Sequence, residues 1–121
     1  MSAPTWIGVA VLGGAGAIAR FVLDSGVMAR IESDFPFGTL VVNGSGALLL
    51  GLLHGIGTGG STLLLAGTAL LGSYTTFSTW MLETHRLAEE GETGAAARNI
   101  LLSLALGIAA VAFGDLIGAA L

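Results

Sequence analysis

The chain has 121 residues, of which 54% are hydrophobic and only 10% are charged, and its formal net charge is −4. Its mean hydropathy is +0.89, and an average soluble domain carries about a quarter charged residues, so the composition indicates one membrane domain. The chain has no lysine and no cysteine, which argues against a nucleic-acid-binding surface and excludes disulfides and thiolate metal sites.

Four stretches are long and apolar enough to cross a membrane, which takes about 20 mostly apolar residues. The first covers about residues 5–23 and lacks the basic start and the cleavage site of a signal peptide. The second and third cover about residues 36–54 and 63–82, separated by the glycine-rich turn GIGTGGST. The fourth covers about residues 100–121. We therefore predict a single all-α domain over residues 1–121 with four transmembrane helices.

The arginines of the chain lie on one side of this arrangement. The first and third spans are each followed by a charged link, and the arginines near these links are Arg20, Arg30, Arg86 and Arg98. The positive-inside rule places both links in the cytoplasm and both termini outside.

The stretch GSYTTFSTW, residues 72–80, places five Ser or Thr hydroxyls inside the third span. One or two such hydroxyls bond back to their own helix. A cluster this dense, directly after a glycine, predicts that the third helix is broken near its middle. A break within a membrane is tolerated where protein or water surrounds it, and it exposes backbone groups to an ion.

Two further features of the spans have both a structural and a functional reading. Asn43, with Thr39 four residues earlier on the same face, either joins two helices by hydrogen bonds or donates along a polar path. Phe77 and Trp80 share a face, where they either pack ordinarily or turn their positive ring edges toward an anion.

The segments GGAGAIAR (13–20), FPFGTLVVNGSGALLLG (35–51) and GSYTTFSTW (72–80) resemble, in order and spacing, the motifs of the Fluc/CrcB fluoride channels. The resemblance covers nearly the whole chain. It implies a small multi-pass protein of the bacterial inner membrane that exports fluoride passively. It also implies an antiparallel dimer with two pores and a central structural sodium ion.

The same resemblance implies roles for particular residues. Those expected along the fluoride pathway are Asn43, Phe77, Trp80, Ser78, Thr79, Thr39 and Glu83. The backbone carbonyls of Gly72 and Thr75 are expected to bind sodium at the two-fold axis. Arg20 is expected near a pore vestibule, unless it only extends to the interface and pairs with Asp24.

This sequence departs from the family pattern at two positions: Trp80 replaces the second Phe, and Ser73 replaces the second Gly. The indole of Trp80 is larger than a phenyl ring and adds an N–H donor. It either obstructs the row of aromatic side chains expected along the pathway or changes the shape of that row. The one-sided arginines favour a fixed orientation, whereas an antiparallel homodimer needs the chain to insert both ways. The expected partner is therefore the chain itself or, in preference, a paralogue of opposite orientation.

Three other classes of protein fit the sequence less well. A small multidrug antiporter would need a carboxylate in the first span for proton coupling, and residues 1–23 contain none. A purely structural membrane protein would not need Asn43 and the hydroxyl cluster. An enzyme is not expected, because Glu83, His85 and Glu89 lack a nucleophile and metal-ligand spacing.

Overall fold

The computed structural model describes all 121 residues, and its regular secondary structure consists of helices without strands. In chain order the helices are α1 (Ala3–Arg30), α2 (Phe37–Gly55), α3 (Gly60–Thr62), η1 (Leu63–Leu71), α4 (Gly72–Tyr74), α5 (Ser78–Glu89) and α6 (Thr93–Ala120).

Helix α1 begins at a side-chain cap and ends well beyond the first expected span. The Ser2 hydroxyl accepts a hydrogen bond from the Thr5 N–H at its start. The helix continues past residue 23 to Arg30, since Gly26 does not interrupt it and no proline follows before Pro36. Residues 24–30, which were expected in the charged link after the first span, are thus part of the helix. Arg30 lies at its C-terminus, where a cation is favoured.

Glycines allow α2 and α6 to pack backbone against backbone along most of their length. A Cβ at Gly51 would overlap the Val111 carbonyl, and one at Gly114 would overlap the Leu48 carbonyl. Helix α1 approaches the third segment in the same way, since a Cβ at Gly16 would overlap Leu70 O. Small residues replace the hydrophobic effect as the means of close helix packing in a membrane.

The third segment is interrupted where the hydroxyl cluster predicted a break. Helices α3, η1 and α4 follow one another without a gap, and η1 has the wide π-helical form in which the Gly72 N–H bonds to Gly67 O. At Thr75 the backbone becomes extended, with φ −81° and ψ 160°, and helix α5 begins only at Ser78. Helical geometry is therefore lost between α4 and α5.

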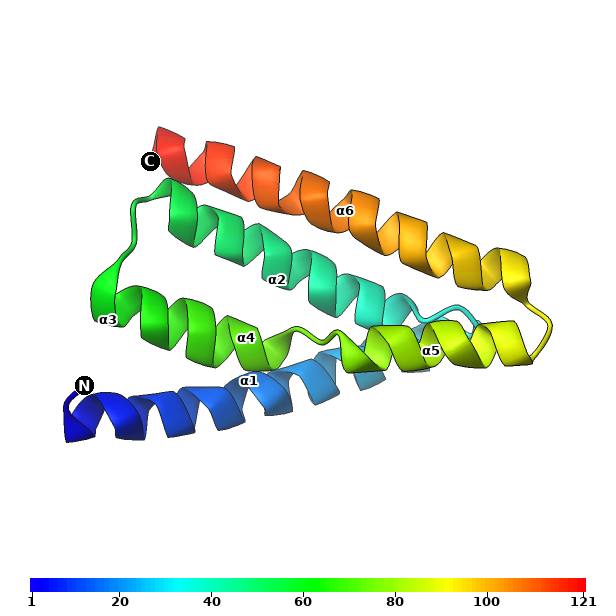
Figure 1. Cartoon of the computed structure of the whole chain (residues 1–121), viewed down its shortest axis with the longest axis horizontal. Helices are drawn as coiled ribbons and strands as arrows, with labels where there is room; N and C mark the ends of the chain where they lie inside the picture. Colours follow the sequence, from blue (N-terminus) through cyan, green and yellow to red (C-terminus); the bar gives the residue numbers. More distant parts are fainter.

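The helices lie side by side, with the two termini and the α2–α3 turn at one end of the molecule (Figure 1). The α1–α2 and α5–α6 links lie at the other end. Only 16 of the 121 residues are buried, and large apolar side chains are exposed along α1 and α6. The chain therefore has a small interior of its own, as expected of a protein that meets lipid or a partner on most faces.

Three helices, α1, α2 and α6, are long and apolar enough to span a membrane. The third expected span, residues 63–82, is divided among η1, α4 and α5, so no single helix of that segment reaches the length needed.

Candidate functional site

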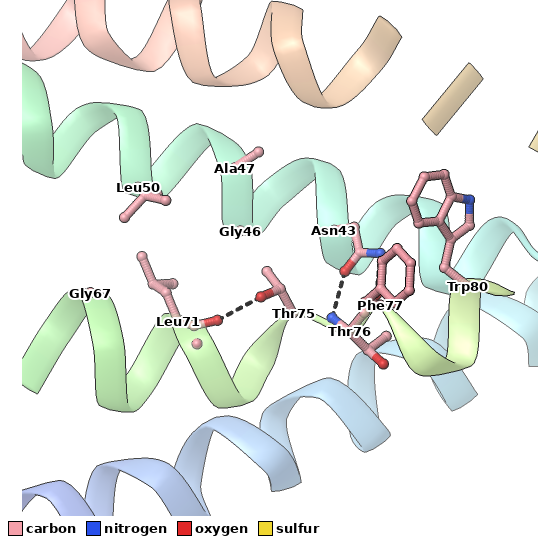
Figure 2. A pocket seen from close by; sticks show the side chains of 11 residues that line it. Asn43, Gly46, Ala47, Leu50, Gly67, Leu71, Thr75, Thr76, Phe77 and Trp80 are labelled. Atoms are coloured by element: carbon pink, nitrogen blue, oxygen red, sulfur yellow. Dashed lines mark hydrogen bonds between the residues drawn. The ribbon is translucent and has the colours of Figure 1, made fainter. Parts of the chain in front are cut away.

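The break in the third segment is held by one side chain of α2. Asn43 donates its Nδ2 to Thr76 O at 2.8 Å and accepts from Thr76 N at its Oδ1, also at 2.8 Å. These two bonds satisfy the Thr76 main-chain groups after helical bonding has stopped, as a buried break in a helix requires. Figure 2 shows the amide pointing at the broken backbone.

Beside the break lies an open cavity of about 370 Å³, here called the central cavity. Its lining combines the Asn43 amide and the hydroxyls of Thr75 and Thr76 with apolar groups. Most of its lining comes from α2 and η1 (Figure 2). The glycines of this lining are sites of close packing, since a Cβ at Gly46 would overlap the Thr75 methyl group and one at Gly67 would lie 3.1 Å from a Leu63 methyl group.

Two aromatic rings stand at the edge of the central cavity. The Phe77 and Trp80 centroids are 5.7 Å apart, and the ring planes meet at 83°, so the edge of one ring faces the other. Phe77 is 70% exposed despite its apolar ring. The Trp80 Nε1 donates to the main-chain carbonyl of Asn99 in α6 at 3.1 Å, so the extra donor of Trp80 is engaged within this chain.

A second cavity of about 260 Å³, here called the lateral cavity, lies on the α6 side. Asn43 and Trp80 line both it and the central cavity, and together they form the boundary between the two. The remaining lining comes from α6 and includes Ser103.

A third cavity of about 200 Å³ faces α1 and has the most polar lining, so it is here called the polar cavity. Arg20 and Asp24 line it from α1, and Thr39 and Thr79 line it from the other side. Thr76 lines both this cavity and the central one, which makes the two cavities neighbours.

At the polar cavity, Thr39 is linked to α5. It is 2% exposed and donates its hydroxyl to Glu83 Oε1 at 2.6 Å. A short bond to a carboxylate is stronger than one between neutral groups. This bond therefore joins the beginning of α2 to α5.

The backbone carbonyls of Gly72 and Thr75 accept no hydrogen bond within the chain. The groups that would bond to them in a helix are diverted: the Thr76 N–H bonds to Asn43, and the Thr79 N–H bonds to the Thr76 hydroxyl. Free carbonyl oxygens at a broken helix are the ligands that bind sodium in membrane transporters. The two residues therefore fit the sodium site expected from the sequence.

The structure divides the residues expected along the pathway into two groups. Asn43, Phe77 and Trp80 meet at the central cavity, whereas Thr39 and Thr79 line the polar cavity with Arg20. Glu83 joins the second group through its bond to Thr39.

Two expectations are not matched by contacts within this chain. Ser78 is exposed at the start of α5 and lines none of the three cavities. Arg20 and Asp24 line the same cavity without forming an ion pair, since the ion pairs of the chain are His54–Asp115, His85–Glu89 and Arg86–Glu90.

Sequence reasoning missed Thr76 and Asn99. Thr76 matters here mainly through its main-chain groups, which no residue pattern reveals. Asn99 is 1% exposed. The signal available in the sequence was a lone amide directly before the fourth apolar span.

Comparison with known proteins identifies the relatives of this chain. Residues 7–115 match the family model described as CrcB-like protein, Camphor Resistance (CrcB). A protein of Mycolicibacterium paratuberculosis named fluoride-specific ion channel FluC 2 is 56% identical over 110 residues, which cover 91% of this chain and 90% of the relative.

Two further relatives agree with this assignment. A FluC 2 protein of Mycobacterium bovis is 50% identical over 91% of this chain and 87% of its own length. A FluC 1 protein of Rubrobacter xylanophilus is 48% identical over 88% of this chain and 86% of its own length. The family match and the three apolar helices make this chain a multi-pass membrane protein that belongs to the CrcB-like family.

Proposed function

We propose that this chain is a subunit of a fluoride-selective ion channel that lets fluoride leave the bacterial cell passively. The observation that carries the proposal is the meeting of the Asn43 amide and the Phe77 and Trp80 rings at one cavity beside a broken membrane helix. The relatives named fluoride-specific ion channels, which align over most of the chain, support it.

The chemistry of the central cavity suits a small, strongly hydrated anion. Amide N–H groups, hydroxyls and ring edges offer partial positive charge. None of the residues that line the central cavity carries a full charge. Conduction needs binding that is strong enough to admit the ion and weak enough to release it, and neutral donors meet both needs.

Asn43 retains a donor for the ion while it holds the break. Its Nδ2 carries two N–H groups, and one of them is engaged by Thr76 O. The second is the donor we assign to fluoride, with the exposed Phe77 ring beside it. Thr76 connects this point to the polar cavity, where Arg20 would attract anions and Thr39, Thr79 and Glu83 would continue the path.

The assembly belongs to the same proposal. The segment from η1 to α5 would be the third of four membrane spans, with the break inside it. Exposed apolar faces and a small interior favour a dimer, for which we propose the antiparallel form with two pores that the resemblance implies. Because its arginines are one-sided, we favour a paralogue over a second copy as the partner.

A structural sodium ion would lie at the two-fold axis of that dimer. Gly72 and Thr75 would hold it through the carbonyls that no N–H group in the chain reaches. The ion would supply positive charge that stabilises the broken backbone. Replacing sodium with N-methylglucamine in detergent should lower the melting temperature of the purified dimer, and an unchanged melting temperature would remove sodium from the proposal.

The channel activity is tested by fluoride efflux from liposomes that contain this chain, with chloride efflux as the control. Fluoride-selective efflux from the chain alone supports the channel and shows that a second copy suffices as partner. If the chain is silent alone but active with its paralogue, the channel is a heterodimer. Silence in both cases, from folded protein and also with Trp80→Phe, would refute the proposed function.

A further inference from the structure

A hydrogen-bond network behind Trp80 joins α5 to α6. The Asn99 Nδ2 donates to the Thr84 hydroxyl at 2.9 Å and to Trp80 O at 3.4 Å. The Thr84 hydroxyl donates to the same Trp80 carbonyl at 2.8 Å. The Trp80 Nε1 donates to the main-chain carbonyl of Asn99 at 3.1 Å, so the indole is held by the backbone of Asn99, while the Asn99 side chain holds the backbone of Trp80 and the Thr84 hydroxyl.

This network restricts the orientation of the indole. With its N–H held by a carbonyl of α6, the ring cannot rotate without breaking that bond, and a broken bond is costly in a membrane-protein interior. The ring meets Phe77 in the edge-to-face arrangement described above. The position of the Trp80 ring relative to the pathway is therefore determined partly from α6.

Asn99 acts on the pathway only through Trp80 and Thr84. It is 1% exposed and lines none of the three cavities. Trp80, in contrast, lines both the central and the lateral cavity. A shift of the indole would therefore change the boundary between these cavities, whereas Asn99 itself never meets an ion.

We propose that Asn99 is a positioning residue: its side chain fixes α6 to α5, which keeps its main-chain carbonyl in place for the Trp80 indole, holds the ring edge-on to Phe77 and thereby sets the opening between the central and lateral cavities. The effect on ion passage rests on the proposed function, whereas the orientation of Trp80 does not. The network depends on the indole N–H, which a phenylalanine at this position would lack.

The first test measures the orientation of Trp80 directly. In the Trp6→Phe background, Trp80 is the one remaining tryptophan. Asn99→Ala keeps the main-chain carbonyl but removes the side-chain bonds to α5, so the carbonyl should hold the indole less firmly. The fluorescence anisotropy of Trp80 should fall, and its quenching by acrylamide should increase. Thr84→Val, which removes the hydroxyl at the centre of the network, should act in the same direction, while Thr68→Val, at an exposed position of η1, should leave the signal unchanged. Unchanged fluorescence in folded Asn99→Ala and Thr84→Val would overturn the proposal.

The second test separates positioning from a general loss of structure. Fluoride efflux is measured for Asn99→Ala with Trp80 present and again together with Trp80→Phe. Loss of about one net hydrogen bond corresponds to a two- to tenfold fall in rate with Trp80 present. Once the indole is gone, the same substitution should have no further effect on the rate, because the ring through which Asn99 reaches the pathway is absent.

An equal fall in both backgrounds would assign Asn99 a merely structural role and overturn the proposal. If no form of the protein conducts fluoride, the proposed function fails, and the fluorescence experiment still decides whether Asn99 positions Trp80. Gel filtration of each variant confirms that folded protein is compared.

Discussion

Asn43 is the residue on which the local backbone and the proposed chemistry both depend. Its amide pairs with both main-chain groups of Thr76, which replaces the helical bonds lost at the break. The same side chain lies on the boundary between the central and lateral cavities. A single amide therefore supports the break and faces the path that the break opens.

Replacing Asn43 should thus affect stability and transport together. Asn43→Ala leaves the Thr76 N–H and carbonyl without partners, which costs about 1–3 kcal/mol for buried groups, and it removes the assigned fluoride donor. We expect a lower melting temperature in detergent and a large loss of fluoride efflux.

Asn43→Asp is the matched variant of the same shape. It keeps an acceptor for the Thr76 N–H but places a second oxygen against Thr76 O and adds negative charge to an anion path. It should also lose efflux. A melting temperature of Asn43→Ala equal to that of the unmodified protein would contradict the supporting role of the amide.

At the scale of the elements, glycines decide how closely the helices approach. Gly114 of α6 faces the Leu48 carbonyl of α2, and Gly51 of α2 faces the Val111 carbonyl of α6, with no room for a Cβ at either place. Gly107, on the same helix as Gly114, has no neighbouring atom within 4 Å of the Cβ it lacks. One helix thus contains both a glycine required by packing and one that packing does not require.

This contrast gives a matched pair of substitutions. Gly114→Ala should separate α2 from α6 and lower the free energy of unfolding by about 1–3 kcal/mol, as overpacking does. Gly107→Ala should leave stability unchanged or raise it by up to about 1 kcal/mol, because alanine favours helix. Unfolding in mixed detergent measures both, and equal effects of the two would show that the α2–α6 contact does not depend on Gly114.

At the scale of the whole molecule, the arrangement of the ends matches the distribution of arginines. Both termini and the α2–α3 turn lie at one end, and the links before α2 and before α6 lie at the other (Figure 1). Arg30, Arg86 and Arg98 belong to the elements that flank these links. The positive-inside rule therefore predicts one orientation for the chain.

The absence of cysteine makes this orientation simple to measure with single cysteines and a membrane-impermeant maleimide on intact cells. With a fixed orientation, cysteine at Ser2 or Thr58 should react from outside, and cysteine at Glu92 should react only after permeabilisation. Equal labelling at all three positions would show insertion in both directions and would favour a homodimer over the proposed heterodimer.

Hydropathy and local residue types were sufficient to predict several features of this protein. Apolar length identified α1, α2 and α6 as helices able to span a membrane, because backbone groups in lipid must be satisfied within the helix. The dense hydroxyls of residues 72–80 located the break, which the structure places between Tyr74 and Ser78. These features depend on neighbours in the chain, so they can be read from the sequence.

Other features depend on which helix faces meet, and only the tertiary structure decided them. Helical spacing placed Thr39 and Asn43 on one face, yet Thr39 bonds to Glu83 while Asn43 bonds to Thr76. The donor that Trp80 adds is engaged by Asn99, a residue 19 positions away. Such pairings join segments that are distant in sequence, and their geometry is set by glycine-mediated helix packing, which residue spacing along one helix does not specify.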